Sequence, residues 1–348
     1  MITSVQMPGL PALRIVFFAT VHPLSWLPAG LGSEVIEAWL AIKAYIYGIR
    51  RARRLIIFFT VRDVSSGWRT AAILGKWLRF RVIVETVLVG ADDAASLLRA
   101  RWPLLTRRAA RSVACFSAIS TALKVSFAND LPHATVAYNP YGIDTELFQP
   151  ATSDRRQFQR QAFGLEDAAF VGLFVGNVNP RKDVLSLIEG WIETASRRTD
   201  TQWILLIAGH YEAKSEYFQL VQQRLANVPR NASVRFLGAR DDIPSIMTAC
   251  DAYVSASTAE GLGIANVEAM ASGLPVVCRH FPGIADDMKH GDAVASIVDW
   301  SPVAFAQTMD RIASPNYRQR CAADARTIAV ERSALGGRID RLQALIRG

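Results

Sequence analysis

The sequence predicts an α/β protein with two doubly wound domains, each built on a largely parallel sheet. Nearly continuous apolar runs alternate with helix-like segments, which is the pattern of parallel strands buried on both faces. A turn-rich stretch at 139–150, followed by polar residues to 165, interrupts this alternation, and we expect a linker there. Because 348 residues suffice for two domains of ordinary size, we place the domains at 1–155 and 156–325.

The first half begins with an apolar strand at 13–21 and a Pro- and Gly-rich loop at 22–32. Ser33 is a candidate N-cap for a helix that extends to about Gly48. The remaining predicted elements of this half are strand 55–61, helix 66–78, and strands 81–87, 113–117 and 136–138.

The second half repeats the alternation. Its predicted strands, with helices between them, are 170–176, 203–208, 234–237, 252–256, 276–278 and 295–298. Residues from 314 onward are typical of helix, and we expect 326–348 to pack back on the first domain. Ligands of such sheets bind at the carboxyl ends of strands, so we expect the site in a cleft between the domains.

The positive charge is confined to the first half. Residues 1–150 contain 17 Lys and Arg against 9 Asp and Glu, whereas the remainder is neutral and the whole chain carries +8. Clusters occur at 50–54 and at Arg107, Arg108 and Arg111. Such a face suits an anionic membrane surface, a phosphorylated acceptor or nucleic acid, and a solvated basic surface is the equal alternative. No nucleic-acid partner is expected, because aromatic and basic residues are not interleaved.

Cysteine usage and hydropathy point to the cytoplasm. The four cysteines are scattered without a CxxC pair, which argues against a disulfide framework or a structural zinc site. Glu34, Glu37 and Lys43 break the apolar region near the start, and residues 1–12 lack the charged opening of a secretory signal. We therefore expect a cytoplasmic protein, with a peripheral position on the inner face of the membrane as the other location.

Residues 259–277 contain two carboxylates, Glu260 and Glu268, around a glycine turn. Helix formers follow Gly263, and Ser272 with Gly273 closes the helix. A carboxylate accepts two hydrogen bonds from a sugar diol, and a second one beside a turn can hold sugar hydroxyls or face charge at an anomeric carbon. In the alternative, both are solvated helix acids, which the apolar neighbours of Glu268 disfavour.

Three further strand ends are candidates. In VGNVNPRKD (175–183), Arg181 and Lys182 precede a helix whose N-terminus suits a diphosphate, although exposed basic turns are equally common. His210 is better explained as a loop histidine. Gly238 begins a turn that suits a nucleobase edge, and Asp242 is a candidate helix cap.

Together these segments resemble a known family. The Glu-x7-Glu spacing in EGLGIANVEAMASGLPVV, with VGNVNPRKD, ILLIAG, VRFLGARDDI, CDAYVSAS and YGIDTELF, is similar to the retaining glycosyltransferases of family 4, or glycosyl transferases group 1. Those enzymes have the GT-B fold, with two Rossmann-like domains facing a cleft. The resemblance covers residues 140–320 in detail and 1–140 in outline. No Rossmann GxGxxG or P-loop motif competes with it.

The resemblance implies roles for the donor side. Glu268 would hold the ribose hydroxyls, and Glu260 would contact the transferred sugar. Lys182, which we expect to be catalytic together with Glu260, matches the family's diphosphate clamp. The family's clamp Arg, directly after the strand-end Gly176, is Asn177 here, and Arg181 is the candidate substitute. The implied backbone contacts come from Leu262, Gly263 and Ile264.

On the acceptor side the chain departs from the family, which often carries a His in a stretch that corresponds to 82–93. This stretch has no His, so Glu85, Asp92 and Asp93 are the candidates to face the cleft. His22 is another. Gly30 and Gly32 match the family's glycine-rich loop in outline, and an ordinary turn is the equal alternative.

The predicted activity is therefore sugar transfer, with retention, from a nucleotide-diphosphate sugar to an acceptor hydroxyl. No cofactor and no metal are expected besides this donor, and the acceptor would be a glycan or lipid-linked carrier in polysaccharide or glycolipid synthesis. Two alternatives are an epimerase or hydrolase of the same fold, and a non-catalytic homologue that binds membrane or nucleic acid through its basic half.

Overall fold

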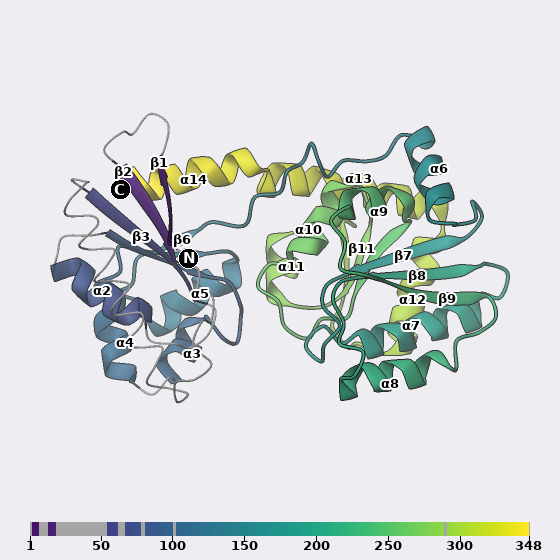
Figure 1. The fold of residues 1–348 in the computed structure, drawn as a ribbon, viewed down its shortest axis with the longest axis horizontal. Coiled ribbons are helices and arrows are strands. Elements are labelled where there is room, and N and C mark those ends of the chain that lie inside the picture. Colours follow the sequence, from purple (N-terminus) through teal and green to yellow (C-terminus); the bar gives the residue numbers. More distant parts are fainter. Residues whose placement is uncertain are drawn as a thin grey trace. The chain divides into compact units, whose positions relative to one another are not determined.

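A computed structural model describes residues 2–6, 13–18, 54–61, 67–77, 81–99, 102–288 and 291–347 of the chain (Figure 1). It contains two compact units, residues 1–140 with 340–348 and residues 141–339. Each unit is an α/β layer structure around a largely parallel sheet, which confirms the predicted fold class. The proposed domain boundary near 155 stays a prediction.

The sheet of the first unit follows the chain in the order β1-β2-β3-β4-β5-β6. All its neighbours are parallel except β1 and β2, where Ile2 lies opposite Phe18. The sequence analysis did not identify β1, since its short ITSVQ segment lacks the continuous apolar run of a central strand. The strands are β1 (Ile2–Gln6), β2 (Leu13–Phe18), β3 (Arg54–Val61), β4 (Arg81–Thr86), β5 (Cys115–Ala118) and β6 (Val136–Tyr138).

Helices pack on this sheet around a core that includes Trp68, Phe116 and Phe127. The predicted helix at 66–78 is confirmed, whereas three short helices between residues 94 and 130 were not predicted. The predicted helix that begins at Ser33 lies outside the described residues. The described helices of this unit are α2 (Gly67–Trp77), α3 (Ala94–Arg99), α4 (Pro103–Ala110) and α5 (Thr121–Asp130).

The second sheet has the order β12-β11-β10-β7-β8-β9, and its neighbours are all parallel. From β7 the chain proceeds outward through β8 to β9. It then returns to β10, which is adjacent to β7 on the other side, and proceeds outward in the opposite direction through β11 to β12. The predicted strands of this half are all confirmed. They are β7 (Phe170–Val175), β8 (Trp203–Ala208), β9 (Ala232–Gly238), β10 (Ala252–Ser255), β11 (Val276–Arg279) and β12 (Val294–Ile297).

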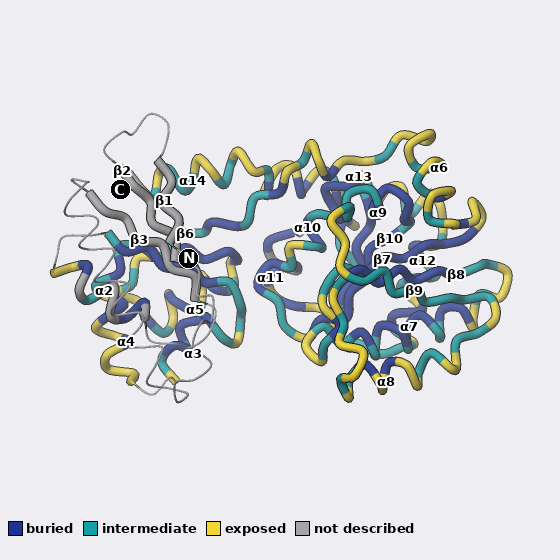
Figure 2. The backbone as a smooth tube through the Cα atoms, in the orientation of Figure 1, coloured by how far each residue is buried: buried dark blue, intermediate teal, exposed yellow. Residues whose placement is uncertain are grey.

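Large aromatic side chains fill the core of the second unit, and its central strands are buried (Figure 2). Trp191 meets Trp203 edge-on, with ring centroids 5.6 Å apart. Trp191 also lies over Gly172, where an added Cβ would come within 2.5 Å of the ring. Helices α7 (Val184–Arg197), α8 (Glu216–Leu225), α9 (Ile243–Ala249), α10 (Ile264–Ala271), α11 (Pro282–Asp287), α12 (Pro302–Ala313) and α13 (Pro315–Ser333) complete the unit.

The polar segment expected to be a linker instead contains helix α6 (Ser153–Ala162). Its Thr152 cap accepts a hydrogen bond from the Arg155 amide. Arg160, although charged, is buried and donates to the carbonyls of Ala249 and Ala169 at 3.0 and 2.6 Å. The sequence pattern missed this helix because arginine hydrogen bonds, not an apolar stripe, attach it to the unit.

The predicted helical C-terminus is confirmed by α13 and by α14 (Leu335–Arg347). The residues of α14 from Asp340 onward belong to the first unit, where Arg81 donates to the Leu345 carbonyl at 3.4 Å. None of the helices in the described part of the chain is both long and apolar enough to cross a membrane.

Candidate functional site

The site residues follow the carboxyl ends of β7 and β10. From this adjacent pair the chain continues to β8 and β9 on one side and to β11 and β12 on the other. Such a switch point leaves a crevice above the strand ends, where ligands of open α/β sheets bind. The loops 176–183 and 256–263 therefore stand at the position that the topology favours for a ligand.

The first loop begins with two backbones in close contact. The Gly176 amide donates to the Ala208 carbonyl at 2.8 Å, and an added Cβ on Gly209 would lie 2.0 Å from the Gly176 carbonyl oxygen. Only glycine permits this approach at residue 209. The Lys182 side chain crosses Gly176, since a Cβ there would lie 3.2 Å from Lys182 Cε. The absence of a side chain at Gly176 thus makes room for Lys182.

Lys182, Arg181 and Glu260 form one charged cluster. Lys182 Nζ lies 2.5 Å from Glu260 Oε1, across 78 positions of sequence, and Arg181 Nη1 lies 3.2 Å from the same oxygen. The Lys182 and Glu260 side chains are only 17% and 12% exposed. Two cations against one carboxylate leave the cluster positive, which suits an anionic ligand.

Arg181 is held in this cluster by backbone contacts as well. Its guanidinium donates to the Ala259 carbonyl at 2.8 Å, while its own carbonyl accepts from the Thr258 amide at 2.9 Å. Asn177, at the position of the family's clamp Arg, is exposed. Arg181 therefore directs its charge to the same place as Lys182, although its role toward a donor stays a prediction.

The glycine turn leads into α10 with Gly263 as the N-cap residue. Gly263 has φ 72°, a left-handed conformation that favours glycine, and no side chain caps the helix. The first amides of such a helix are oriented outward and favour negative charge. The predicted backbone contacts of Leu262, Gly263 and Ile264 belong to this turn.

Glu268 lies one turn further along α10, and its carboxyl is mostly buried. Burial raises the pKa of Glu268 to about 7, because the charged form is poorly solvated there. The helix then ends as predicted, with Gly273 at φ 72°. The apolar neighbours of Glu268 disfavoured a freely solvated carboxyl, and its partial burial agrees with that expectation.

Tyr253 on β10 is a buried residue of the site that was not predicted from the sequence. Its hydroxyl donates to the Val175 carbonyl at 3.4 Å. Burial raises the pKa of Tyr253, and the negative charges of Glu260 and Glu268 raise it further. Both carboxylates are thus close enough to act on one hydroxyl. A tyrosine inside an otherwise apolar strand was the available signal.

A second missed feature fixes the loop that carries Lys182. Asp183 is the only non-glycine residue with positive φ (47°) in the described ranges. Its Oδ1 accepts from the Ser186 amide at 3.3 Å, which caps α7, and its Oδ2 pairs with Arg279 Nη2 at 2.5 Å. The Arg279 guanidinium also lies 5.2 Å from the Trp300 ring centroid. These contacts hold a strained residue directly after Lys182.

The other strand-end predictions have mixed outcomes. His210 is exposed, in keeping with a loop histidine, and Gly238 has φ 69° at the end of β9. Asp242 occupies the predicted N-cap position of α9, but the expected side-chain cap is wrong, because its carboxylate makes no bond to the helix and instead binds Arg240 at 2.6 Å. This pairing lowers the pKa of Asp242.

The acceptor-side candidates of the first unit are mostly used within their own loop. Asp92 Oδ2 accepts from the amides of Val87 and Leu88 at 3.0 and 3.1 Å. Asp93 Oδ1 accepts from the Ser96 amide at 2.9 Å at the start of α3. Glu85 is buried on β4. Any contact of these three with an acceptor stays a prediction.

The remaining candidates, His22, Gly30 and Gly32, lie outside the described residues. Within the described ranges, no three His, Cys, Asp or Glu side chains are grouped as metal ligands. The expectation of a reaction without metal stays a prediction.

Comparison with known sequences places this site in context. Residues 155–328, half of the chain, match the family model described as Glycosyl transferases group 1. A lipopolysaccharide core biosynthesis mannosyltransferase, LpsB of Rhizobium meliloti, is 28% identical over 61% of this chain and 63% of its own length. A GDP-mannose-dependent monoacylated phosphatidylinositol monomannoside mannosyltransferase of Corynebacterium glutamicum is 31% identical over 49% and 45%. The chain thus spans less than two thirds of these relatives.

Solved structures share the fold at lower identity. Anabaena HepE in complex with UDP and glucose is 21% identical, with a TM-score of 0.72 over 92% of this chain and 84% of its own. Sucrose-phosphate synthase from Thermosynechococcus elongatus is 17% identical, with a TM-score of 0.72 over 99% and 84%. These likenesses confirm the GT-B fold expected from the sequence.

Proposed function

The chain belongs to the glycosyl transferases group 1 family, and from this premise we propose that it moves a sugar from a nucleoside-diphosphate sugar to an acceptor hydroxyl with retention of the anomeric configuration. The observation that carries the proposal is the cluster of Lys182, Arg181 and Glu260 beside the uncapped start of α10. Two cations and a helix N-terminus suit a diphosphate, and a carboxylate next to them suits sugar hydroxyls.

The leaving group determines what Lys182 does. When the bond between the anomeric carbon and the diphosphate oxygen breaks, negative charge grows on that oxygen, and a nearby ammonium stabilises the change. The acceptor oxygen forms the new bond to the same carbon on the same face. Its proton passes to the departing diphosphate, so no separate protein base is required. Arg181 adds a second positive charge on the same side.

In the structure, Lys182 is paired with Glu260. A diphosphate competes for the same ammonium, because it carries more charge than a single carboxylate. We infer that donor binding draws Lys182 away and frees Glu260 Oε1 to accept hydroxyls of the transferred sugar. Glu260 would then face the positive charge that develops at the anomeric carbon.

Glu268 is assigned to the ribose of the donor. A ribose diol donates two hydrogen bonds to one carboxylate, and such bonds are strongest where little water competes. The raised pKa of Glu268 indicates a poorly solvated carboxyl of this kind. Hydrogen bonds from the ribose would replace the hydrogen bonds to water that the Glu268 carboxylate loses through burial.

Acceptor binding is assigned to the first unit, because the donor residues all lie in the second. The relatives include enzymes named for lipopolysaccharide core synthesis and for a diphosphoundecaprenol-linked sugar. We propose a glycan or lipid-linked acceptor in cell-surface polysaccharide or glycolipid synthesis, a cytoplasmic location, and no cofactor besides the donor.

A thermal-shift screen tests donor recognition. Purified protein is heated with UDP, GDP, ADP and their sugars at one common concentration, and a ligand whose dissociation constant is about 100-fold below that concentration adds about 2.7 kcal/mol to the free energy of unfolding. One nucleoside diphosphate should raise Tm clearly above the others. Proton NMR of the product then reports the anomeric configuration. Absence of any nucleotide shift, or an inverted product, would contradict the proposal.

A further inference from the structure

Helix α4 presents one face to solvent that its own unit does not explain. Leu104, Arg107, Arg108 and Arg111 are spaced i, i+3, i+4 and i+7, which places them on one side of the helix and its C-cap. All four are exposed, and Leu104 is 82% exposed. The opposite side buries Thr106, Ala109 and Ala110 in the unit. The outer face thus combines an apolar side chain with three cations.

The charge of this face is not balanced by acids. Residues 94–129 contain no Asp or Glu, and none of the three arginines forms an ion pair within the described residues. Cations near a helix C-terminus interact favourably with the helix dipole, which accounts for the position of the arginines on α4. The dipole does not account for the exposed leucine among them.

Two further large apolar side chains of this unit are exposed, one directly before α4 and one at the end of the helix that packs on α4. Trp102 directly precedes α4 and is 52% exposed. α4 packs against α2, which ends at Trp77, 87% exposed and next to the exposed Lys76. Tryptophan and leucine beside Arg and Lys are the composition of segments that lie in a membrane interface, with apolar groups inserted and cations at headgroup level.

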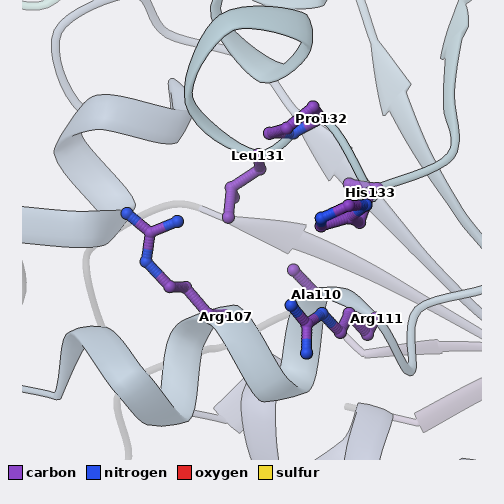
Figure 3. Close-up of a pocket in the computed structure, with 7 residues that line it drawn as sticks. Arg107, Ala110, Arg111, Leu131, Pro132 and His133 are labelled. Atoms are coloured by element: carbon purple, nitrogen blue, oxygen red, sulfur yellow. The ribbon is translucent and has the colours of Figure 1, made fainter.

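A shallow pocket at the edge of this face is also basic. Arg107 and Arg111 border it from α4, and His133 borders it from the loop between α5 and β6 (Figure 3). Leu131 and Ala110 contribute apolar lining between them. A phosphate at this opening would meet two guanidinium groups that no described acid neutralises.

We propose that this face, defined as Trp102, Leu104, Arg107, Arg108 and Arg111, docks the protein on an anionic phospholipid bilayer. Trp102 and Leu104 enter the interface, and the arginines bind headgroup phosphates. Charge complementarity selects this occupant, because anionic lipid attracts an acid-free basic face and accepts the exposed apolar groups within it. The inference does not depend on the proposed sugar transfer, although docking would bring a lipid-linked acceptor to the enzyme.

Vesicle sedimentation tests the docking face. The full-length protein is spun with vesicles of phosphatidylcholine alone or mixed with phosphatidylglycerol, at about 0.15 M and about 1 M salt. We expect binding to the anionic vesicles that falls at high salt. The triple change Arg107→Ala, Arg108→Ala and Arg111→Ala should weaken it on the order of 100-fold, since each cation near the surface contributes about fivefold.

A matched control removes equal charge elsewhere. Arg155→Ala, Lys214→Ala and Arg230→Ala alter three exposed cations of the second unit and should leave vesicle binding nearly unchanged. Trp102→Ala with Leu104→Ala should weaken the salt-resistant part of binding, whereas Leu220→Ala on α8 should not. Far-UV circular dichroism and urea unfolding of every variant report whether both units remain folded.

Three results would overturn the docking face. One is equal loss of vesicle binding in the control triple, which would show that net charge alone acts. Another is unchanged binding of the Trp102 and Leu104 variant. The third is failure of the unaltered protein to bind anionic vesicles while it binds duplex DNA through the same arginines. Loss of nucleotide shifts with intact vesicle binding would instead contradict only the proposed sugar transfer.

Discussion

The two glutamates of the site, eight positions apart, occupy opposite electrostatic environments. Glu260 touches Lys182 and Arg181, so two cations match its negative charge. Glu268 is half-buried on α10, and its pKa rises to about 7. The loop after β7 supplies the first carboxylate with cations, and the helix supplies the second with apolar neighbours. The spacing of two carboxylates in the sequence therefore does not determine whether each of them is stabilised as an ion.

This difference suggests a division of labour. Glu260 shares its charge with the groups that would stabilise a leaving diphosphate, so changes around it should act on turnover. No cation among the described residues forms an ion pair with Glu268, which gains most from hydrogen-bond donors, so changes there should act on binding.

The largest expected effect is on the Glu260 side. Lys182→Ala removes the ammonium that would stabilise the leaving diphosphate, and we expect turnover to fall by about 10²- to 10³-fold. Steady-state assays with the donor found by thermal shift provide the measurement. Lys214→Ala, an exposed lysine on the same unit, is the control. A fall in affinity alone, with unchanged kcat, would place Lys182 in binding and not in the chemical step.

The next effect is on the Glu268 side. Glu268→Gln keeps the shape but removes the charge that accepts ribose hydrogen bonds, which should weaken nucleotide binding by about 1–3 kcal/mol, or about 5- to 150-fold. Calorimetric titration measures this. Glu212→Gln, an exposed acid, should bind like the unaltered protein. Unchanged nucleotide affinity in Glu268→Gln would refute the ribose assignment.

The same substitution should stabilise the protein at high pH. A folded pKa of about 7, above the ordinary 4.5, means that the folded state holds the proton more tightly. Stability is therefore highest at low pH and falls as pH rises toward 7, by up to about 3 kcal/mol. Glu268→Gln removes this loss, so urea unfolding should show its largest gain near pH 8 and almost none near pH 5. An equal effect of Glu268→Gln on the free energy of unfolding at both pH values would show that Glu268 ionises normally.

Nucleotide affinity should increase with pH over the range in which Glu268 loses its proton, whereas the stability of the protein decreases over that range. Ribose donors bind the ionised carboxylate, so binding requires Glu268 to lose its proton. Below its pKa of about 7, each pH unit should cost affinity, and Kd should rise about tenfold between about pH 8 and pH 6. Calorimetry across this range tests it, with Glu268→Gln as the control that lacks the dependence. A flat profile in the unaltered protein would contradict the model of a buried, hydrogen-bond-seeking carboxylate.

The sequence predicted the site unevenly, for physical reasons. Strands such as β8 and the glycine turn before α10 were predictable, because apolar runs and Gly263 act locally. The contact between Lys182 and Glu260 was not predicted, because the topology joins residues 78 positions apart, and the resemblance implied only that each of them faces the donor. α6 was missed because Arg160 attaches it through carbonyls that no sequence pattern reveals. For Asp183 nothing in the sequence indicated a left-handed backbone.

Asp183 offers the smallest and most specific test. Asp183→Ala and Asp183→Gly both remove the α7 cap and the Arg279 pair, so they differ only in tolerance of φ 47°. Glycine adopts this conformation freely, whereas alanine does not, and the strain is worth about 1 kcal/mol. We therefore expect the glycine variant to be more stable than the alanine variant by about that amount in urea unfolding, against the usual order. An alanine variant at least as stable would show that the backbone at Asp183 relaxes once its side-chain contacts are gone.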